Sequence, residues 1–185
     1  MYGYAWADSG ASTLYGIAWE SGAIDTGAGA IELNGGTNGS PSTATNDNFG
    51  VGLGPNHGSA NDVPKLISSA TATVTGSVTA TGTSNYWAVA VAYADITTGS
   101  GGFNVSSSQR STAWEGNTFR SPVSFSGDST TLSGTNSFAD DVTFTATAGD
   151  VNVSGSQTAT GTSAPVTFKA TSNVLVNANA TISTG

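Results

Sequence analysis

The stretch Val142-Thr143-Phe144-Thr145-Ala146-Thr147 returns 24 residues later as Val166-Thr167-Phe168-Lys169-Ala170-Thr171. In both copies an apolar side chain occupies every second position. A period of two is typical of a β-strand that buries one face. The sequence therefore predicts short strands that recur about once every 24 residues.

Other repeats extend this spacing along the chain. Residues 23–33 return as residues 95–105 with their apolar positions kept, and this offset of 72 equals three periods of 24. Residues 76–84 and 155–163 are also alike, at an offset of 79, although low-complexity sequence produces such matches by chance. A fixed period along a chain is the signature of a repeat architecture.

A coil explains a repeat of this kind. Each repeat makes one turn, and successive turns stack about 4.8 Å apart as parallel sheets. One turn alone buries too little apolar surface to offset the entropy of ordering it, whereas stacked turns shield each other. We predict one all-β domain over residues 1–185, a parallel β-helix (β-solenoid) with about 24 residues per coil and about seven coils.

The composition favours strands over helices. Apolar residues make up 37% of the chain and include many Val, Ile, Phe, Tyr and Trp, whose shapes suit a pleated surface. Good helix formers are scarce, since Leu occurs six times, Glu three times and Met once. Cysteine is absent, which excludes disulfides, thiolate metal sites and cysteine nucleophiles.

The charge pattern excludes two classes of partner. The net charge is −8, and the four bases are scattered, so we expect no nucleic-acid partner. No run approaches the ~18 apolar residues of a membrane helix, so we expect no membrane insertion. The first residues lack the pattern of a signal peptide, so we expect either a removed export signal or an excised piece of a longer protein. The bases are Lys65, Arg110, Arg120 and Lys169.

Three regions depart from the simple repeat. Residues 35–65 are rich in Gly, Asn and Ser and carry three prolines, which predicts a loop excursion from the coil. Residues 107–121 are more charged than their surroundings, which predicts a second excursion. Residues 86–94 are apolar on both faces, so we expect a strand that is covered on both sides or faces a partner.

Several segments resemble the repeats of filamentous-haemagglutinin-like bacterial exoproteins and related autotransporter passengers. They are residues 24–35 (IDTGAGAIELNG), 96–105 (ITTGSGGFNV), 149–155 (GDVNVSG) and 174–185. The resemblance covers about two thirds of the chain. It implies a right-handed parallel β-helix, export from the cell, and a role in adhesion or surface architecture.

No catalytic machinery is visible. The single histidine, His57, lies in a Gly-, Pro- and Asn-rich segment, and the abundant serines place some serine near it by chance. We therefore interpret His57 as a loop-surface residue rather than part of a Ser-His-Asp triad. One histidine without cysteine cannot hold zinc. We predict no enzyme, no catalytic residue, no metal site and no cofactor.

Several acids are candidates for calcium ligands. Asp47, Asp62 and the pair Asp140-Asp141 lack both the Asp-x-Asx-x-Asx-Gly pattern and a glycine-rich calcium repeat. Neighbouring residues on a strand point to opposite faces, so Asp140 and Asp141 would not chelate together there. We expect solvated acids at these positions.

Carbohydrate cleavage would need two converging carboxylates. Asp25 and Glu32 are candidates by position, but their equivalents in the 72-residue repeat are Thr97 and Asn104. Variable residues on a shared frame indicate outward, solvated positions. The four tryptophans could form a sugar platform, although packing in the core or between coils is the favoured interpretation. They are Trp6, Trp19, Trp87 and Trp114.

Threonine rows leave a second function open. Hydroxyls at every second residue lie on one face of a strand at regular spacing, and such an array could order water and bind ice. Threonine is also simply a good outward strand residue. The rows are Thr71/Thr73, Thr79/Thr81/Thr83, Thr143/Thr145/Thr147 and Thr158/Thr160/Thr162.

The ends of the coil carry the functional prediction. Residues 174–185 still follow the repeat, and an open strand edge invites another strand. We predict a non-enzymatic, extracellular structural protein, a surface filament or adhesin segment. Its partners would be copies of itself, or further solenoid coils of a longer parent chain, stacked end to end. The alternative is a glycan- or ice-binding module of the same fold.

Overall fold

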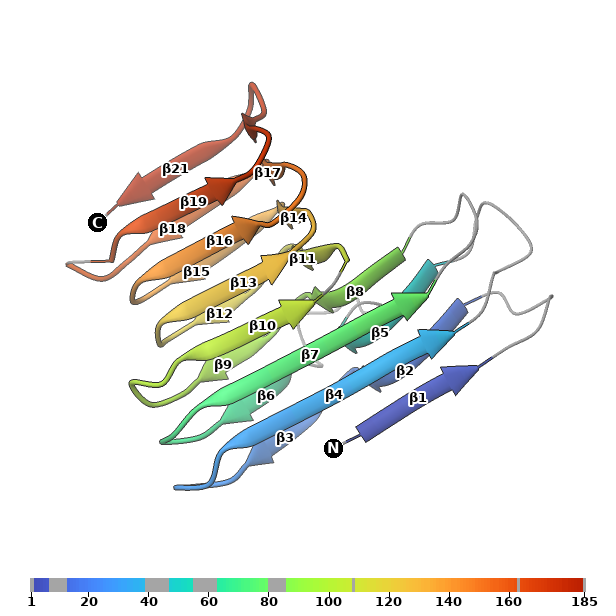
Figure 1. Cartoon of the computed structure of the whole chain (residues 1–185). Helices are drawn as coiled ribbons and strands as arrows, with labels where there is room; N and C mark the ends of the chain where they lie inside the picture. Colours follow the sequence, from blue (N-terminus) through green and yellow to red (C-terminus); the bar gives the residue numbers. More distant parts are fainter. Residues whose placement is uncertain are drawn as a thin grey trace.

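The computed structural model describes residues 2–6, 13–38, 47–54, 63–79, 86–107, 109–162 and 164–184. All regular secondary structure in these segments is β-strand, and none of them holds a helix that could span a membrane. The strands form three seven-stranded sheets, here named A, B and C, and each sheet takes every third strand of the chain. Figure 1 shows the resulting coil, with its long N-terminal strands and shorter C-terminal ones.

Sheet A contains β1 (Tyr2–Trp6), β4 (Ile31–Asn38), β7 (Ala72–Thr79), β10 (Phe103–Ser107), β13 (Val123–Gly127), β16 (Val142–Ala146) and β19 (Val166–Ala170). Sheet B contains β2 (Thr13–Trp19), β5 (Asp47–Leu53), β8 (Tyr86–Val91), β11 (Ser111–Ala113), β14 (Thr130–Leu132), β17 (Val151–Val153) and β20 (Val174–Val176). Sheet C contains β3 (Gly22–Asp25), β6 (Pro64–Ile67), β9 (Asp95–Thr97), β12 (Thr118–Phe119), β15 (Thr135–Phe138), β18 (Ser156–Ala159) and β21 (Thr181–Thr184).

The predicted parallel β-helix is confirmed. Each strand from β1 to β18 pairs in parallel with the strand three places further along the chain, as in β16 with β19. One strand from each sheet makes one turn, called a rung below. The structure has seven rungs, as the repeat spacing predicted.

The predicted rung length of about 24 residues fits the C-terminal rungs and is wrong for the N-terminal ones. Val142 pairs with Val166, 24 positions later, but Val123 pairs with Val142 after only 19. Near the N-terminus Ile31 pairs with Ala72, 41 positions later. The 72-residue repeat consequently spans two rungs rather than three. Its members are Ile24, Leu66 and Ile96 in sheet C and Ile31, Ala72 and Phe103 in sheet A.

The core consists of columns of apolar side chains that run along the coil. Phe125 stacks on Phe144 with ring centroids 5.1 Å apart, and Phe119 stacks on Phe138 at 5.3 Å. All four rings are fully buried. Stacking like on like gives each rung most of its apolar contact with the next rung, which is why the alternating repeat folds as a coil.

The excursion predicted for residues 35–65 is wrong in its described part. Half of β4, all of β5 and the start of β6 lie within it. The glycines that suggested a loop instead allow sheets A and B to touch. A Cβ added to Gly35 would lie 2.2 Å from the carbonyl oxygen of Gly50, and one on Gly76 would lie 1.8 Å from that of Ala88.

The second predicted excursion, residues 107–121, is also wrong. It contains β11 and β12, which pair with their neighbours in sheets B and C. Strand residues and two corner residues, Asn117 and Ser121, are buried, whereas the charged residues that suggested a loop lie exposed around the corners between the strands. Arg110, Glu115 and Arg120 are all exposed.

The strand expected to be covered on both sides is β8. Residues 88–91 are fully buried, although neighbouring side chains on a strand point in opposite directions. The prediction of cover on both faces is therefore confirmed.

Candidate functional site

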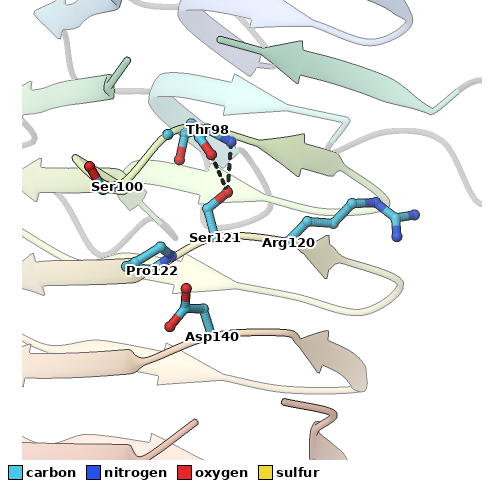
Figure 2. Close-up of a pocket in the computed structure, with 7 residues that line it drawn as sticks. Thr98, Ser100, Arg120, Ser121, Pro122 and Asp140 are labelled. Carbon is cyan, nitrogen blue, oxygen red and sulfur yellow. Dashed lines mark hydrogen bonds between the residues drawn. The ribbon is translucent and has the colours of Figure 1, made fainter. Parts of the chain in front are cut away.

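A shallow depression of ≈ 290 Å³ lies at the corner between sheets C and A. Ser121 Oγ accepts a hydrogen bond from the Thr98 amide and donates one to the Thr98 carbonyl, each at 2.7 Å. Figure 2 shows Arg120 extending away from Asp140 rather than toward it. The guanidinium instead forms an ion pair with Asp95, with Nε 3.0 Å from Oδ1.

This depression offers no acid-base pair. The hydrogen bond to Asp95 raises the pKa of Arg120, and the negative charge of the carboxylate makes a smaller contribution in the same direction. Arg120 is paired with Asp95, and Asp140 is the only carboxylate among the described residues that line the hollow. Glycoside cleavage needs two carboxylates on either side of the bond, and this corner supplies one.

Asp25 and Glu32, the two candidate catalytic acids, each make a separate local hydrogen bond. Asp25 ends β3, and its Oδ1 accepts the Gly27 amide at 2.9 Å, so it stabilises a turn. Glu32 lies on β4 and accepts a hydrogen bond from the Asn34 side chain at 2.9 Å. Both residues are exposed, and the register confirms Thr97 and Asn104 as their equivalents.

The acids expected to be solvated are Asp47, Asp62, Asp140 and Asp141. Asp140 and Asp141 are exposed in the turn before β16, where Asp140 Oδ1 accepts the Asp141 amide at 2.8 Å. The backbone of Asp47 begins β5, while Asp62 and His57 lie outside the described residues. Within the described segments, no three His, Cys, Asp or Glu side chains are grouped closely enough to hold a metal ion.

The tryptophans with described side chains pack within the coil, as the sequence predicted. Trp19 is half-buried against the core. Trp87 stacks on Phe49 with centroids 5.4 Å apart, and Trp114 meets Trp87 edge-on at 5.1 Å. The side chain of Trp6 lies outside the described residues.

The threonine rows are shorter than predicted. Thr143 and Thr145 are both partly exposed on β16, and Ser124 and Ser126 lie beside them on β13. Thr147 turns away at the corner, where its hydroxyl donates to the Gly127 carbonyl at 2.9 Å. Thr160 likewise donates to the Phe138 carbonyl, and residues 81 and 83 lie outside the described residues.

The most distinctive surface is the face of the C-terminal rung. β19, β20 and β21 are the edge strands of the three sheets, and no described element packs beyond them. Val174 and Val176 lie in register above Val151 and Val153, which are fully buried. The side chains of Val174 and Val176 are nevertheless 43% and 52% exposed, and Leu175 and Ile182 are also exposed on this rung.

At the opposite end the structure has a hollow that the sequence did not reveal. β1 pairs with residues 34–38 of β4, so among the described strands only β7 lies beside residues 31–33. A depression of ≈ 260 Å³ lies there, lined among others by Trp19, Ile24, Ile31 and Leu33. The indole N–H of Trp19 is buried and has no hydrogen-bond partner among the described residues.

A buried amide ladder was also missed. Asn117 Nδ2 donates to Asn136 Oδ1 at 2.8 Å, and Asn136 Nδ2 donates to Gln157 Oε1 at 3.0 Å. Each amide also donates to a corner carbonyl three residues earlier in the chain. The repeated Asn-x-Phe at residues 117–119 and 136–138 was the available signal, because it places an amide two residues before a core phenylalanine.

Comparisons with protein-family models, with curated proteins and with solved structures give no match to this chain. The likeness to filamentous-haemagglutinin-like repeats thus stays a prediction, and the function must be argued from the molecule.

Proposed function

We propose that this chain is a non-enzymatic structural rod, a segment of an extracellular filament or surface adhesin whose rungs continue end to end. The observation that carries the proposal is the open face of the C-terminal rung. Its core positions Val174 and Val176 are about half exposed, although the same columns are fully buried one rung earlier. An apolar strand edge of this kind is a template for another strand.

Two further features support a structural role. Stacked rungs interact mainly with their neighbours, so such a coil can be lengthened without redesign. Several carboxylates hold turns, an ion pair or hydrogen bonds along the coil, as Asp25 and Asp95 illustrate. Export and display at the cell surface follow from the resemblance to bacterial exoprotein repeats.

Immunogold labelling tests the location and form of the rod. Antibodies raised against the chain should decorate filaments or the outer surface of intact source cells in electron micrographs. Label confined to the cell interior would overturn the proposal.

A glycan- or ice-binding face is the second candidate, and one observation favours it. On the outer face of sheet A, Ser124, Thr143 and Thr167 form one column, and Ser126 and Thr145 begin a second. Strands about 4.8 Å apart, with alternate residues about 6.6 Å apart, make this a regular hydroxyl lattice. Inhibition of ice recrystallisation that disappears in Thr143→Val/Thr145→Val, or binding on a glycan array, would support it.

A further inference from the structure

We infer that Gln109 and Arg110 cap an internal step in the coil and so keep a strand of a second copy of this chain from pairing there. The step lies between the third rung (β7, β8 and β9) and the fourth (β10, β11 and β12), in the middle of the molecule. The inference goes beyond the proposed function, because it concerns the side of the rod and holds whatever continues from either end.

The step arises because the strands of the third rung in sheets A and B are longer than those of the fourth. β7 runs to Thr79, but β10 pairs with it only as far as Gly76, and Figure 1 shows β7 extending past the end of β10. β8 starts at Tyr86, but β11 pairs with it only from Val89 onward. Beyond these points the described strands beside β7 and β8 are β4 and β5 of the second rung. An open strand edge of this kind is a template for another chain.

Gln109 closes the sheet A side of the step with its side chain. The amide of Ala72 donates to the Gly102 carbonyl on the side of the fourth rung, and the period of two turns the amide of Val78 the same way. β10 has ended there, and the Val78 amide instead donates to Gln109 Oε1 at 3.0 Å. Val78 is only 2% exposed, so water is a poor alternative partner. A buried N–H without an acceptor costs free energy, and the side chain of Gln109 therefore replaces the missing strand.

Arg110 closes the sheet B side with both its backbone and its side chain. Its carbonyl oxygen accepts the N–H of Ala88 at 2.7 Å, one residue before β11 begins. Its guanidinium carbon lies 5.0 Å from the centre of the ring of Tyr86, the first residue of β8. A cation is attracted to the face of an aromatic ring. The charged group therefore lies beside the open edge, where charge disfavours the addition of a second strand.

The cap is anchored to the fifth rung. The carbonyl oxygen of Gln109 accepts the Asp128 amide at 3.0 Å and the Ser107 hydroxyl at 2.9 Å. Gly127, which ends β13, makes room for this contact, because a Cβ there would lie 2.4 Å from the same oxygen. Gln109 thus bonds to the fifth rung through its backbone and to the third rung through its side chain, which fixes it across the step.

Gln109→Leu tests the cap in the full chain, because it removes the acceptor of the Val78 amide. That amide should then exchange with solvent about 3- to 10-fold faster, the equivalent of one hydrogen bond. The amide of Val74, within the part of β7 that β10 covers, should keep its rate. Hydrogen exchange followed by NMR measures both amides. Gln109→Glu keeps an acceptor oxygen at the same reach and should restore the original rate.

A single cysteine measures association through the step, because the chain has none of its own. Ser77→Cys places an exposed thiol on β7 beside the step. Under mild oxidation it should form a disulfide-linked dimer in the Gln109→Leu/Arg110→Ala background and little or none in the capped chain. Thr143→Cys is the matched control, since it lies on the outer face of sheet A in β16, away from the step, and should not respond to the cap.

An unchanged Val78 exchange rate in Gln109→Leu, or equal dimer formation by Ser77→Cys in the capped and uncapped chains, would overturn the inference. Dimers of Thr143→Cys that rise together with those of Ser77→Cys would overturn it as well, because they indicate nonspecific aggregation. Circular dichroism checks the fold. Gln109→Asn, whose amide is one methylene group too short to reach Val78, gives the same comparison if leucine unfolds the chain.

Discussion

At the scale of single residues, the buried amide ladder fixes the register of successive rungs, because each amide bonds both to the next rung and to a corner carbonyl. Asn136 receives hydrogen bonds from Asn117 and donates to Ser133 and Gln157, so it uses both ends of its side chain. A buried polar group that loses its partner costs more than the hydrogen bond gained when it is present. The ladder therefore penalises any slip of one rung against the next.

We expect Asn136→Leu to lower the free energy of unfolding by about 2–4 kcal/mol, since it leaves at least two buried groups without partners at ~1–3 kcal/mol each. Urea unfolding followed by circular dichroism measures the change. Ser137→Ala is the matched control, because Ser137 lies next in β15 and is partly exposed, and its effect should stay within about 0.5 kcal/mol. Equal losses from the two substitutions would contradict a role for the ladder.

Tyr93 gives a residue-scale prediction about pH. Its hydroxyl donates a hydrogen bond to Glu115 Oε1, which raises the pKa of Tyr93, with smaller contributions from burial and from the carboxylate charge. A pKa raised by folding stabilises the native state fully below the ordinary tyrosine value of about 10 and loses that effect as the pH rises through the raised value.

We expect Glu115→Gln to shift the pKa of Tyr93 back toward its ordinary value, because the negative charge and the charge-assisted acceptor are both removed. Tyrosinate absorbance measures the titration, and subtraction of the Tyr93→Phe spectrum isolates this residue from the other four tyrosines. An unchanged titration in Glu115→Gln would show that the hydrogen bond does not control the pKa.

At the scale of elements, glycine sets how closely two sheets approach. A side chain on Gly76 would overlap the carbonyl oxygen of Ala88 at 1.8 Å, so β7 and β8 would have to separate. We expect Gly76→Ala to destabilise the chain by about 1–3 kcal/mol or more, as overpacking does. Gly29→Ala is the control, since its nearest neighbour is at 3.4 Å and its effect should be within about 0.5 kcal/mol. Thermal unfolding compares the two variants.

The same glycines explain where the sequence misled. Alternation such as that of residues 142–147 reports one buried face, so strands could be predicted, and its return 24 residues later indicated parallel stacking. Gly35 and Gly50 have no side chain to alternate, and their role depends on a sheet that lies far away in sequence. The length of each rung could not be predicted either. Ile31, Ala72 and Phe103 lie in one column although the segments between them differ in length.

Of the candidate surfaces, one could be predicted from the sequence and one could not. The apolar positions of β20 could be predicted, because Val174 and Val176 continue the repeat. The hollow beside Ile31 could not, since it depends on where β1 starts to pair with β4. Local pattern thus reveals which face of a strand is apolar, but only the register reveals which neighbours are missing.

At the scale of the whole molecule, stability should vary along the coil. Each rung gains contact from the rungs on either side, so the middle rungs have two neighbours and the outer ones have one. Amide hydrogens of β13, β14 and β16 should therefore exchange with solvent most slowly, and those of β20, whose core side chains are about half exposed, should exchange among the fastest.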